Sequence, residues 1–203
     1  MVSFPVEIVL QGCRALVVGT GPEIVPKVDR LLDAGAVVTV ITEGPPGPEL
    51  SERASRVTLL TRAATDADLE GQTIVFAAPS TTPEGEARAR RWHAAAADAG
   101  RLFCAIDRPE ACTFVNSAVA RAGDLTMTFS TGGRSPAVAR RIREDLEALF
   151  SDPRFARFLA ELGARREGIP RGARAVRMAE AVRGFAVAAS LRFPAWFERG
   201  DEP

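Results

Sequence analysis

Two glycines one residue apart follow an apolar run near the start of the chain, in the segment Leu-Val-Val-Gly-Thr-Gly that ends at Gly21. Gly19 permits a tight turn. Gly21 has no side chain, so the backbone at this position can approach a phosphate closely. Where such a turn joins a strand to a helix, the N–H groups at the helix N-terminus can bind a nucleotide pyrophosphate. The spacing predicts a nucleotide-binding turn. The alternative is a strand–turn–helix unit without a ligand.

The segment after this turn departs from the full glycine fingerprint of dinucleotide-binding proteins. Ile24 occupies the position of the third glycine, and Pro26 follows it. A proline in the first turn of a helix costs little, because the N–H it lacks would be unpaired there. We therefore expect the helix to begin near Ile24. The residues expected to bind the dinucleotide are Gly19, Thr20, Gly21, Pro22, Glu23, Ile24, Thr42, Glu43 and Ala78.

Glu43 is the expected determinant of cofactor choice. It comes just after a second apolar run that ends at Ile41. A carboxylate at this place accepts hydrogen bonds from the adenosine ribose and repels a 2′-phosphate. No arginine adjoins it in the sequence, so NAD is expected rather than NADP. The alternative is an acid in a solvated loop.

Asp107 is the candidate for acid–base chemistry. It ends the apolar segment Leu102–Ile106, and Pro109 prevents that strand from continuing. Ligands of a doubly wound sheet bind at the carboxyl ends of its strands, and a partly desolvated carboxylate there can act as a general base. The alternative is that Asp107 caps a turn near Pro109.

A second glycine-bearing loop, Ser130–Pro136, precedes an amphipathic helix. Its hydroxyls and backbone N–H groups suit an anion at a helix N-terminus, and several arginines follow it. Guanidinium groups pair well with a substrate that carries many carboxylates. The residues expected to bind substrate are Ser130, Thr131, Gly132, Gly133 and Arg134.

These residues need a scaffold, and the pattern of the first half supplies one. Apolar strands alternate with helical segments, which predicts an α/β fold with a Rossmann-like, doubly wound parallel sheet. From residue 113 we predict two strands joined by a turn, and then helices. The expected strands beyond the first two are 57–60, 74–78, 102–106, 113–119 and 125–129. The expected later helices are 83–100, 136–149, 153–166 and 171–191.

The predicted domain organisation has three parts. Residues 1–112 form the NAD-binding domain, 113–150 a dimerisation segment and 151–203 a helical C-terminal domain. A two-stranded ribbon is marginally stable alone, so the same ribbon of a second chain is its expected partner. The chain is therefore expected to form a homodimer.

Composition excludes several classes of protein. The 26 basic and 26 acidic residues cancel, so no overall field attracts nucleic acid or an anionic membrane. No apolar run reaches the roughly 20 residues of a spanning helix, and the N-terminus does not resemble a signal peptide. The three cysteines form no CxxC pair and His93 is the only histidine, which argues against a multi-histidine metal site. A reducing, cytoplasmic setting is expected.

Four segments together resemble the precorrin-2 dehydrogenase/sirohydrochlorin ferrochelatase family, the dehydrogenase–chelatase module of siroheme synthase. The similarity runs through nearly the whole chain in unbroken order, and the Ser-Thr-Gly-Gly-x-Ser-Pro loop is its most specific part. No methyltransferase domain follows, so the chain is similar to the stand-alone form. The segments are Leu16–Gly21 with Lys27, Leu31–Val40, Ile106–Phe114 and Ser130–Arg140.

The resemblance implies a homodimer with an NAD-binding Rossmann domain, a dimerisation segment and a helical C-terminal domain. It implies NAD-dependent oxidation of precorrin-2 to sirohydrochlorin, and in bifunctional members insertion of Fe2+ to give siroheme. The family's essential aspartate maps to Asp107, which could also hold Fe2+ transiently. The loop serine near the substrate in relatives maps to Ser130 or Thr131.

The chain departs from the family at the cofactor turn, at Ala78-Pro-Ser80 and at Cys104. Two rival functions remain open from the sequence. One is a tetrapyrrole- or metal-binding homologue without redox turnover, and the other is an oxidoreductase of the same fold that acts on another small molecule. Titration with NAD and NADP discriminates between redox and non-redox readings.

Overall fold

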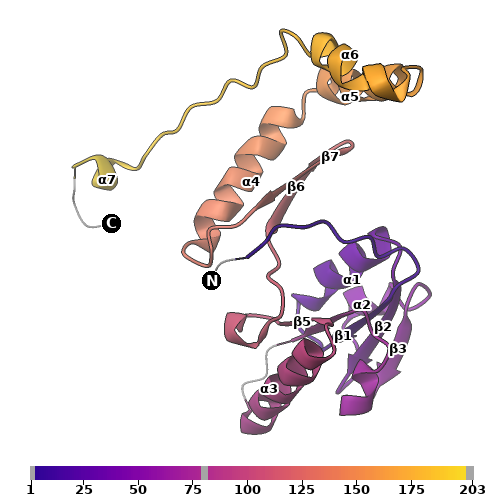
Figure 1. Cartoon of the computed structure of the whole chain (residues 1–203). Coiled ribbons are helices and arrows are strands. Elements are labelled where there is room, and N and C mark those ends of the chain that lie inside the picture. The colour runs from indigo at the N-terminus through magenta and orange to yellow at the C-terminus, as the bar shows by residue number, and fades with distance from the viewer. Residues whose placement is uncertain (1–2, 79–81, 200–203) are drawn as a thin grey trace. The chain divides into compact units, whose positions relative to one another are not determined.

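The computed structural model describes residues 3–78 and 82–199, which fall into two compact units. The first unit contains Met1–Ala118 and Ser130–Ala137, and the second contains Val119–Phe129 and Val138–Pro203. Figure 1 shows the elements of each unit in chain order. The predicted site residues belong to the first unit.

The first unit is built on a parallel sheet of five strands with the order β3-β2-β1-β4-β5. Chain order reverses between β1 and β4, which makes the gap between their carboxyl ends the topological switch point where such sheets bind ligands. The predicted doubly wound sheet is thus confirmed. The strands are β1 (Arg14–Val18), β2 (Val37–Thr42), β3 (Thr58–Thr61), β4 (Ile74–Ala77) and β5 (Leu102–Ala105).

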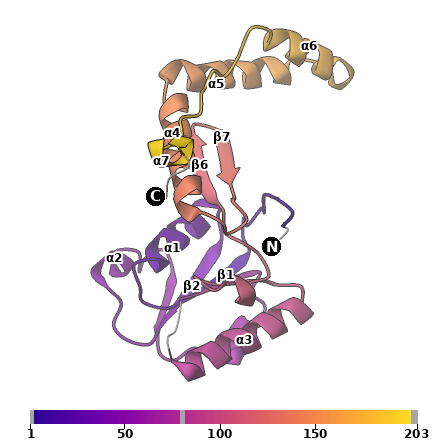
Figure 2. The same ribbon diagram turned by 90° about the vertical axis from the view of Figure 1, so that its left-hand side faces the viewer.

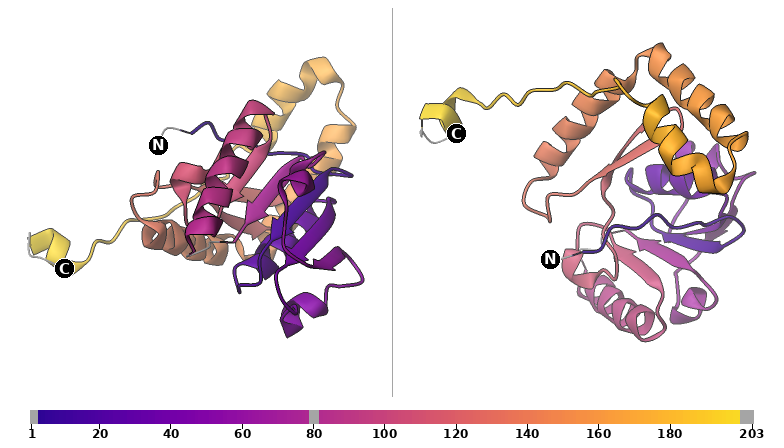
Figure 3. Two further views of the ribbon diagram at one scale, coloured as in Figure 1. Left: turned by 90° about the horizontal axis from the view of Figure 1, so that it is seen from below. Right: turned by 45° about the horizontal axis from the view of Figure 1, so that its top comes forward.

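Helices cover both faces of this sheet. α1 (Ile24–Asp33) and α3 (Pro83–Asp98) lie on opposite faces (Figure 2), and the left panel of Figure 3 shows α3 running along its face. The helix α1 begins at Ile24, as predicted, and Pro26 falls in its first turn. Two short elements, α2 (Pro48–Ser51) and the 3-10 helix η1 (Asp66–Leu69), complete the connections.

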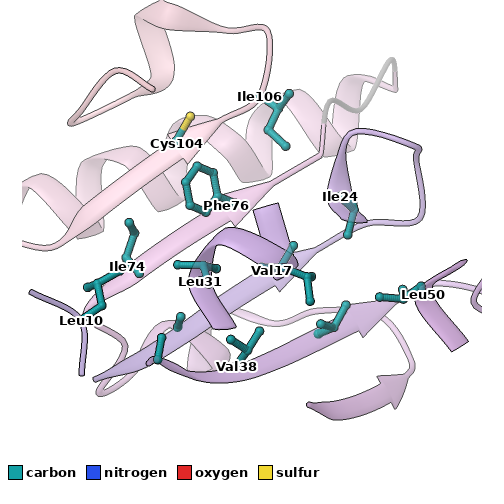
Figure 4. Close-up of a cluster of buried hydrophobic side chains, with 14 residues drawn as sticks. Leu10, Val17, Ile24, Leu31, Val38, Leu50, Ile74, Phe76, Cys104 and Ile106 are labelled. Carbon is teal, nitrogen blue, oxygen red and sulfur yellow. The ribbon is translucent and has the colours of Figure 1, made fainter. Parts of the chain in front are cut away.

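The two faces of the sheet form two apolar clusters. Beneath α1, Val17, Ile24 and Phe76 are buried, together with Cys104 (Figure 4). Trp92 anchors the other face under α3, with its ring 6.3 Å from that of Phe103 in an edge-to-face arrangement. Because β1, β4 and β5 are packed on both faces, the backbone that carries the site is held rigidly.

The segment after β5 differs from the prediction. After the 3-10 helix η2 (Pro109–Ala111), the predicted strand 113–119 forms only from Ala118, because the polar groups of Thr113 are used elsewhere. The Thr113 hydroxyl accepts from the N–H of Phe103 at 2.8 Å and donates to the carbonyl of Arg101 at 2.9 Å. Thr113 therefore ties this segment to the edge of β5.

The second unit contains an antiparallel ribbon and helices. The strands β6 (Ala118–Ala122) and β7 (Leu125–Phe129) form the ribbon, and α4 (Pro136–Phe150) lies beside it in Figures 1 and 2. α5 (Pro153–Glu167) packs against α6 (Arg174–Ala181), as the right panel of Figure 3 shows. The remaining elements are the 3-10 helix η3 (Arg171–Ala173) and α7 (Ala195–Arg199).

The predicted helix 171–191 is wrong in its second half. α6 ends at Ala181, and Gly184 adopts a φ of 89°, a left-handed conformation that ends helices. The Phe185 ring that follows stacks on Phe158, with ring centroids 5.2 Å apart, so aromatic packing takes the place of the expected helical turns. No helix of the residues 3–78 and 82–199 is long and apolar enough to cross a membrane.

Candidate functional site

A cleft of about 380 Å³ opens at the switch point of the sheet, between the carboxyl ends of β1 and β4. The glycine turn forms one side and the first turns of α3 form the other. Six of the nine residues predicted to bind the dinucleotide line this cleft. They are Gly19, Thr20, Gly21, Glu23, Glu43 and Ala78.

The backbone of the turn requires glycine at its first position. Gly19 has a φ of 135°, and a Cβ built on it would overlap the Cβ of Ala78, which lies across the cleft floor. The N–H of Gly19 donates to the carbonyl of Ile41 at 2.9 Å, which continues the pairing of β1 with β2. The turn is thus a cradle of bare backbone, open to a ligand that needs close approach, as a pyrophosphate does.

The start of α1 explains why the fingerprint lacks its third glycine. The Ile24 side chain is fully buried beneath the turn in the cluster with Val17 and Phe76, so it fills the space where other folds pack a glycine. Pro22 is exposed and Thr42 is fully buried, with its hydroxyl donating to the Gly44 carbonyl at 2.8 Å. Thr42 therefore shapes the loop that carries Glu43 and has no surface for a ligand.

One acidic side chain sits where a pyrophosphate would bind. The carboxylate of Glu23 lies against Gly21, since a Cβ added there would overlap its oxygens. Glu23 is also the N-cap residue of α1 and makes no side-chain cap hydrogen bond. Because a flexible side chain can rotate away, the cradle fits a dinucleotide, but at an electrostatic cost that an uncharged residue would not impose.

Glu43 forms an ion pair with an arginine from the other side of the cleft. Arg88 of α3 reaches across the cleft, and its Nη1 lies 2.6 Å from Oε1 of Glu43. The expectation that no arginine lies beside Glu43 is therefore wrong in space, although it is true in sequence. The Arg88 guanidinium also lies 5.4 Å from the centre of the Trp92 ring.

Asp107 occupies an unusual backbone conformation two residues beyond β5. Its φ of 62° is the only positive value among the non-glycine residues that the structure describes. The N–H of Ile106 donates to the Ala77 carbonyl at 2.8 Å, so the chain pairs with β4 up to the residue before Asp107. Strain of this kind gathers at functional sites and costs on the order of 1–3 kcal/mol.

Two expectations about the Asp107 side chain are corrected by the structure. It is exposed rather than partly desolvated. The alternative role as a cap also fails, because the N-cap residue of η2 is Arg108 and that 3-10 helix has no side-chain cap hydrogen bond. The carboxylate therefore projects from a rigid strand end into accessible space.

Neighbouring contacts fix the turn that carries Asp107. Arg108 forms an ion pair with Glu86 of α3 at 2.7 Å, and this hydrogen bond lowers the pKa of Glu86. On the other side, the Cys112 thiol lies 3.3 Å from the Ala105 carbonyl and 3.2 Å from that of Arg108. The strained turn is thus held from α3 and from the segment after η2.

Lys27 brings a cation to the same region. Its Nζ lies 5.5 Å from the centre of the Phe76 ring, on the face of the sheet covered by α1. Burial lowers the pKa of Lys27, as does the nearby Arg30, while Cys104 and Asp107 act in the opposite direction. Lys27 is therefore close enough to Asp107 for their charges to interact.

The loop Ser130–Pro136 is organised by its own hydroxyls. The Thr131 hydroxyl accepts from the N–H of Ser135 at 3.0 Å, and that of Ser130 accepts from Gly132 at 3.2 Å. Gly132 and Gly133 have φ values of 63° and 83°, and Arg134 is exposed. The loop is thus pre-formed, with its arginine directed to solvent and available to an anion.

Comparison with models of known families shows which family the chain belongs to. The family model described as "Putative NAD(P)-binding" matches residues 6–118, more than half of the chain. The chain belongs to this NAD(P)-binding family. A second model, described as "Sirohaem biosynthesis protein central", matches residues 123–149.

Relatives of this NAD(P)-binding chain carry one recurrent name. A siroheme synthase of Gluconobacter oxydans is 35% identical over 155 residues, which is 73% of this chain and 32% of that protein. A siroheme synthase of Methylococcus capsulatus is 34% identical over 176 residues, 82% of this chain and 35% of that protein. The chain thus spans about a third of the length of these relatives.

A solved structure agrees with the fold. The precorrin-2 dehydrogenase SirC superposes with a TM-score of 0.70 over 89% of each chain, at 19% sequence identity. At that identity the likeness shows a shared fold.

The sequence did not reveal the role of Arg88 in the cleft, and it gave no role to Lys27 outside it. Arg88 lies in an alanine-rich helix 45 residues after Glu43, and nothing local marks it as a partner of that carboxylate. Lys27 stood in a segment that carried the resemblance, but its place over the Phe76 ring depends on the packing of α1 on the sheet. Both placements are products of tertiary structure.

Proposed function

We propose that the chain is an NAD-dependent dehydrogenase of siroheme biosynthesis that oxidises precorrin-2 to sirohydrochlorin. The observation that carries the proposal is the bare backbone cradle at Gly19, two strands away from a strained, exposed carboxylate at Asp107. The names of the siroheme synthase relatives and of the structural neighbour supply the substrate.

A dinucleotide bound in this cleft would supply the acceptor for the hydride that precorrin-2 loses. Gly19 and Gly21 would hold its phosphates, and Glu43, one residue after β2, would accept hydrogen bonds from its ribose. Hydride loss from a tetrapyrrole is accompanied by loss of a proton. Asp107 takes up that proton at a carboxylate oxygen, and Lys27 brings a positive charge to the same region.

Substrate binding rests on the loop Ser130–Arg134. Two glycines with positive φ expose its backbone, and Arg134 offers a guanidinium to the carboxylates at the edge of a tetrapyrrole. Arg140 and Arg141 follow in α4, but they pair with Glu144 and Asp145 of the same helix. Arg134 is therefore the cation on which this part of the proposal rests.

Insertion of Fe2+ into sirohydrochlorin is a finer part of the proposal. Metal insertion requires removal of pyrrole protons, and Asp107 is the candidate base for that step as well as a transient oxygen ligand for the incoming metal. Among the described residues there is no cluster of three or more His, Cys, Asp or Glu that could hold a metal ion. The macrocycle itself supplies the nitrogen ligands.

We also propose that the active form is a homodimer in the cytoplasm. The ribbon β6–β7 has only two strands, and Ile142 and Leu149, two helical turns apart on α4, are 38% and 42% exposed. A second copy of this surface would bury both. Sedimentation velocity at micromolar concentration should show a dimer, and a monomer would contradict this part of the proposal.

The test of the dehydrogenase compares the wild type with Asp107→Asn. Asparagine tolerates the left-handed backbone of this position, so the variant should fold normally while the base is lost. The rate of precorrin-2 oxidation should fall by about 10²- to 10⁴-fold. NAD affinity should stay close to that of the wild type, because the cradle is formed by other residues. Wild-type turnover by Asp107→Asn would remove Asp107 from the mechanism.

A second function is favoured by one observation, the carboxylate of Glu23 over the phosphate cradle. It would suit a tetrapyrrole-binding homologue that has lost redox turnover and no longer needs the dinucleotide. Calorimetric titration with NAD separates the two functions. Saturable binding supports the dehydrogenase, and no heat of binding with NAD or NADP supports the binding protein.

A further inference from the structure

The ion pair between Glu43 and Arg88 lies at the end of the cleft where a dinucleotide places its adenosine ribose. Glu43 comes one residue after β2, and Arg88 lies on α3 across the cleft, with 2.6 Å between Oε1 and Nη1. The two charges neutralise each other in the part of the cleft that the 2′-substituent of the ribose would occupy.

Arg88 is the better anchored of the two partners. Its guanidinium lies over the ring of Trp92, which is 1% exposed and donates its indole N–H to Asp66 at 2.7 Å. The Arg88 side chain is 27% exposed, whereas that of Glu43 is 52% exposed. Removing the Glu43 charge should therefore leave the guanidinium over Trp92, close to its present place.

The chemistry of the two residues points to opposite ligands. A carboxylate suits the 2′-hydroxyl of NAD and repels the 2′-phosphate of NADP. A guanidinium held over an aromatic ring suits the phosphate, which it can bind through two hydrogen bonds. The cleft thus contains a cation suited to a 2′-phosphate and, in contact with it, the carboxylate that neutralises it.

We propose that Arg88 is a latent binding site for the 2′-phosphate of NADP and that Glu43 selects NAD by occupying it. The proposal rests on the dinucleotide binding proposed above and names the pair of residues that sets cofactor choice. It predicts that the selectivity changes when Glu43 loses its charge and that this change depends on Arg88.

The test is an equilibrium titration of NAD and NADP, by calorimetry, into the wild type, Glu43→Gln, Arg88→Met and the double variant. The wild type should bind NAD more tightly than NADP. Glu43→Gln should bind NADP about tenfold or more tightly than the wild type does, since a charge-assisted contact is released and a repulsion is removed. The double variant should lose that gain, because methionine keeps the packing over Trp92 without the charge.

Arg91→Met is the matched control. Arg91 lies on the same helix and pairs with Asp66 at 3.1 Å, so this variant removes one positive charge from α3 without touching the Glu43 pair. It should leave the ratio of the two affinities unchanged in the Glu43→Gln background. A thermal melt of each variant confirms that it is folded.

Three results separate the outcomes. Unchanged selectivity in Glu43→Gln, with NAD still bound, would overturn the inference and leave the proposed function standing. A gain for NADP that survives in the double variant would also overturn it, because Arg88 would then not be the phosphate site. If no variant and no wild-type sample binds either dinucleotide, both the inference and the proposed function are wrong.

Discussion

Replacing Gly19 by alanine tests the cradle on which the account of this cleft depends. Gly19→Ala would place a Cβ on the Cβ of Ala78 and force a non-glycine residue to a φ of 135°. The backbone strain costs about 1–3 kcal/mol. Overfilling a packed site costs about 1–3 kcal/mol more. The free energy of unfolding should therefore fall by about 2–6 kcal/mol, a large share of the stability of a domain.

Urea denaturation followed by circular dichroism measures this change. With a slope of about 2 kcal/mol per molar urea, the middle of the usual range, a loss of about 2–6 kcal/mol should lower the midpoint by about 1–3 M. Gly44→Ala is the matched control, because Gly44 has open space around it and is not at positive φ. The control should change stability by less than about 1 kcal/mol. Equal midpoints for Gly19→Ala and Gly44→Ala would refute the reasoning.

Three further outcomes are expected. Glu23→Gln should strengthen NAD binding by about two- to fivefold in calorimetry, because it removes a negative charge at the N-cap of α1, beside the phosphate cradle; weaker binding would contradict this. The hydrogen bond from Arg62 lowers the pKa of Asp68, so the stability that the ionised Asp68 contributes is present above about pH 4 and is lost as pH falls further. In thermal melts at decreasing pH, Asp68→Asn should therefore lose less stability than the wild type. Burial raises the pKa of Cys104 to about 12, so iodoacetamide at pH 8 should label it only after unfolding, as mass spectrometry would show.

The local part of this site could be predicted from the sequence because short-range patterns determine it. The run from β1 through the glycine turn to α1 has its apolar periodicity, its glycines and its proline within twenty residues. Pro26 even located the start of α1, because a proline is tolerated in the first turn of a helix and not beyond it. The place of Asp107 after a strand was predicted in the same way, because an apolar run precedes it and Pro109 prevents that strand from continuing.

The errors arose where tertiary contacts outweigh local pattern. The segment 113–117 has the composition of a strand, but Thr113 gives its hydroxyl to the backbone of β5 and Phe114 packs its ring 5.4 Å from that of Phe76. The stretch beyond α6 looks helical until the left-handed Gly184 and the stacking of Phe185 redirect it. Neither effect can be read from propensity.

The Glu43–Arg88 pair shows the same limit for function. The position of Glu43 predicted a preference for NAD, and the sequence beside it held no opposing cation. The structure supplies that cation from α3. In the inference drawn above, cofactor choice therefore depends on where α3 brings Arg88 as well as on the residue that follows β2.

The most direct test of the central claim follows precorrin-2 and NAD together with the purified protein in the absence of oxygen. Formation of sirohydrochlorin is measured by its visible absorbance and reduction of the nicotinamide by its near-ultraviolet absorbance. The account predicts one reduced dinucleotide for each sirohydrochlorin, over many turnovers, at a rate that Asp107→Asn lowers. Sirohydrochlorin formed at the same rate without NAD, or no oxidation of precorrin-2 at all, would contradict it.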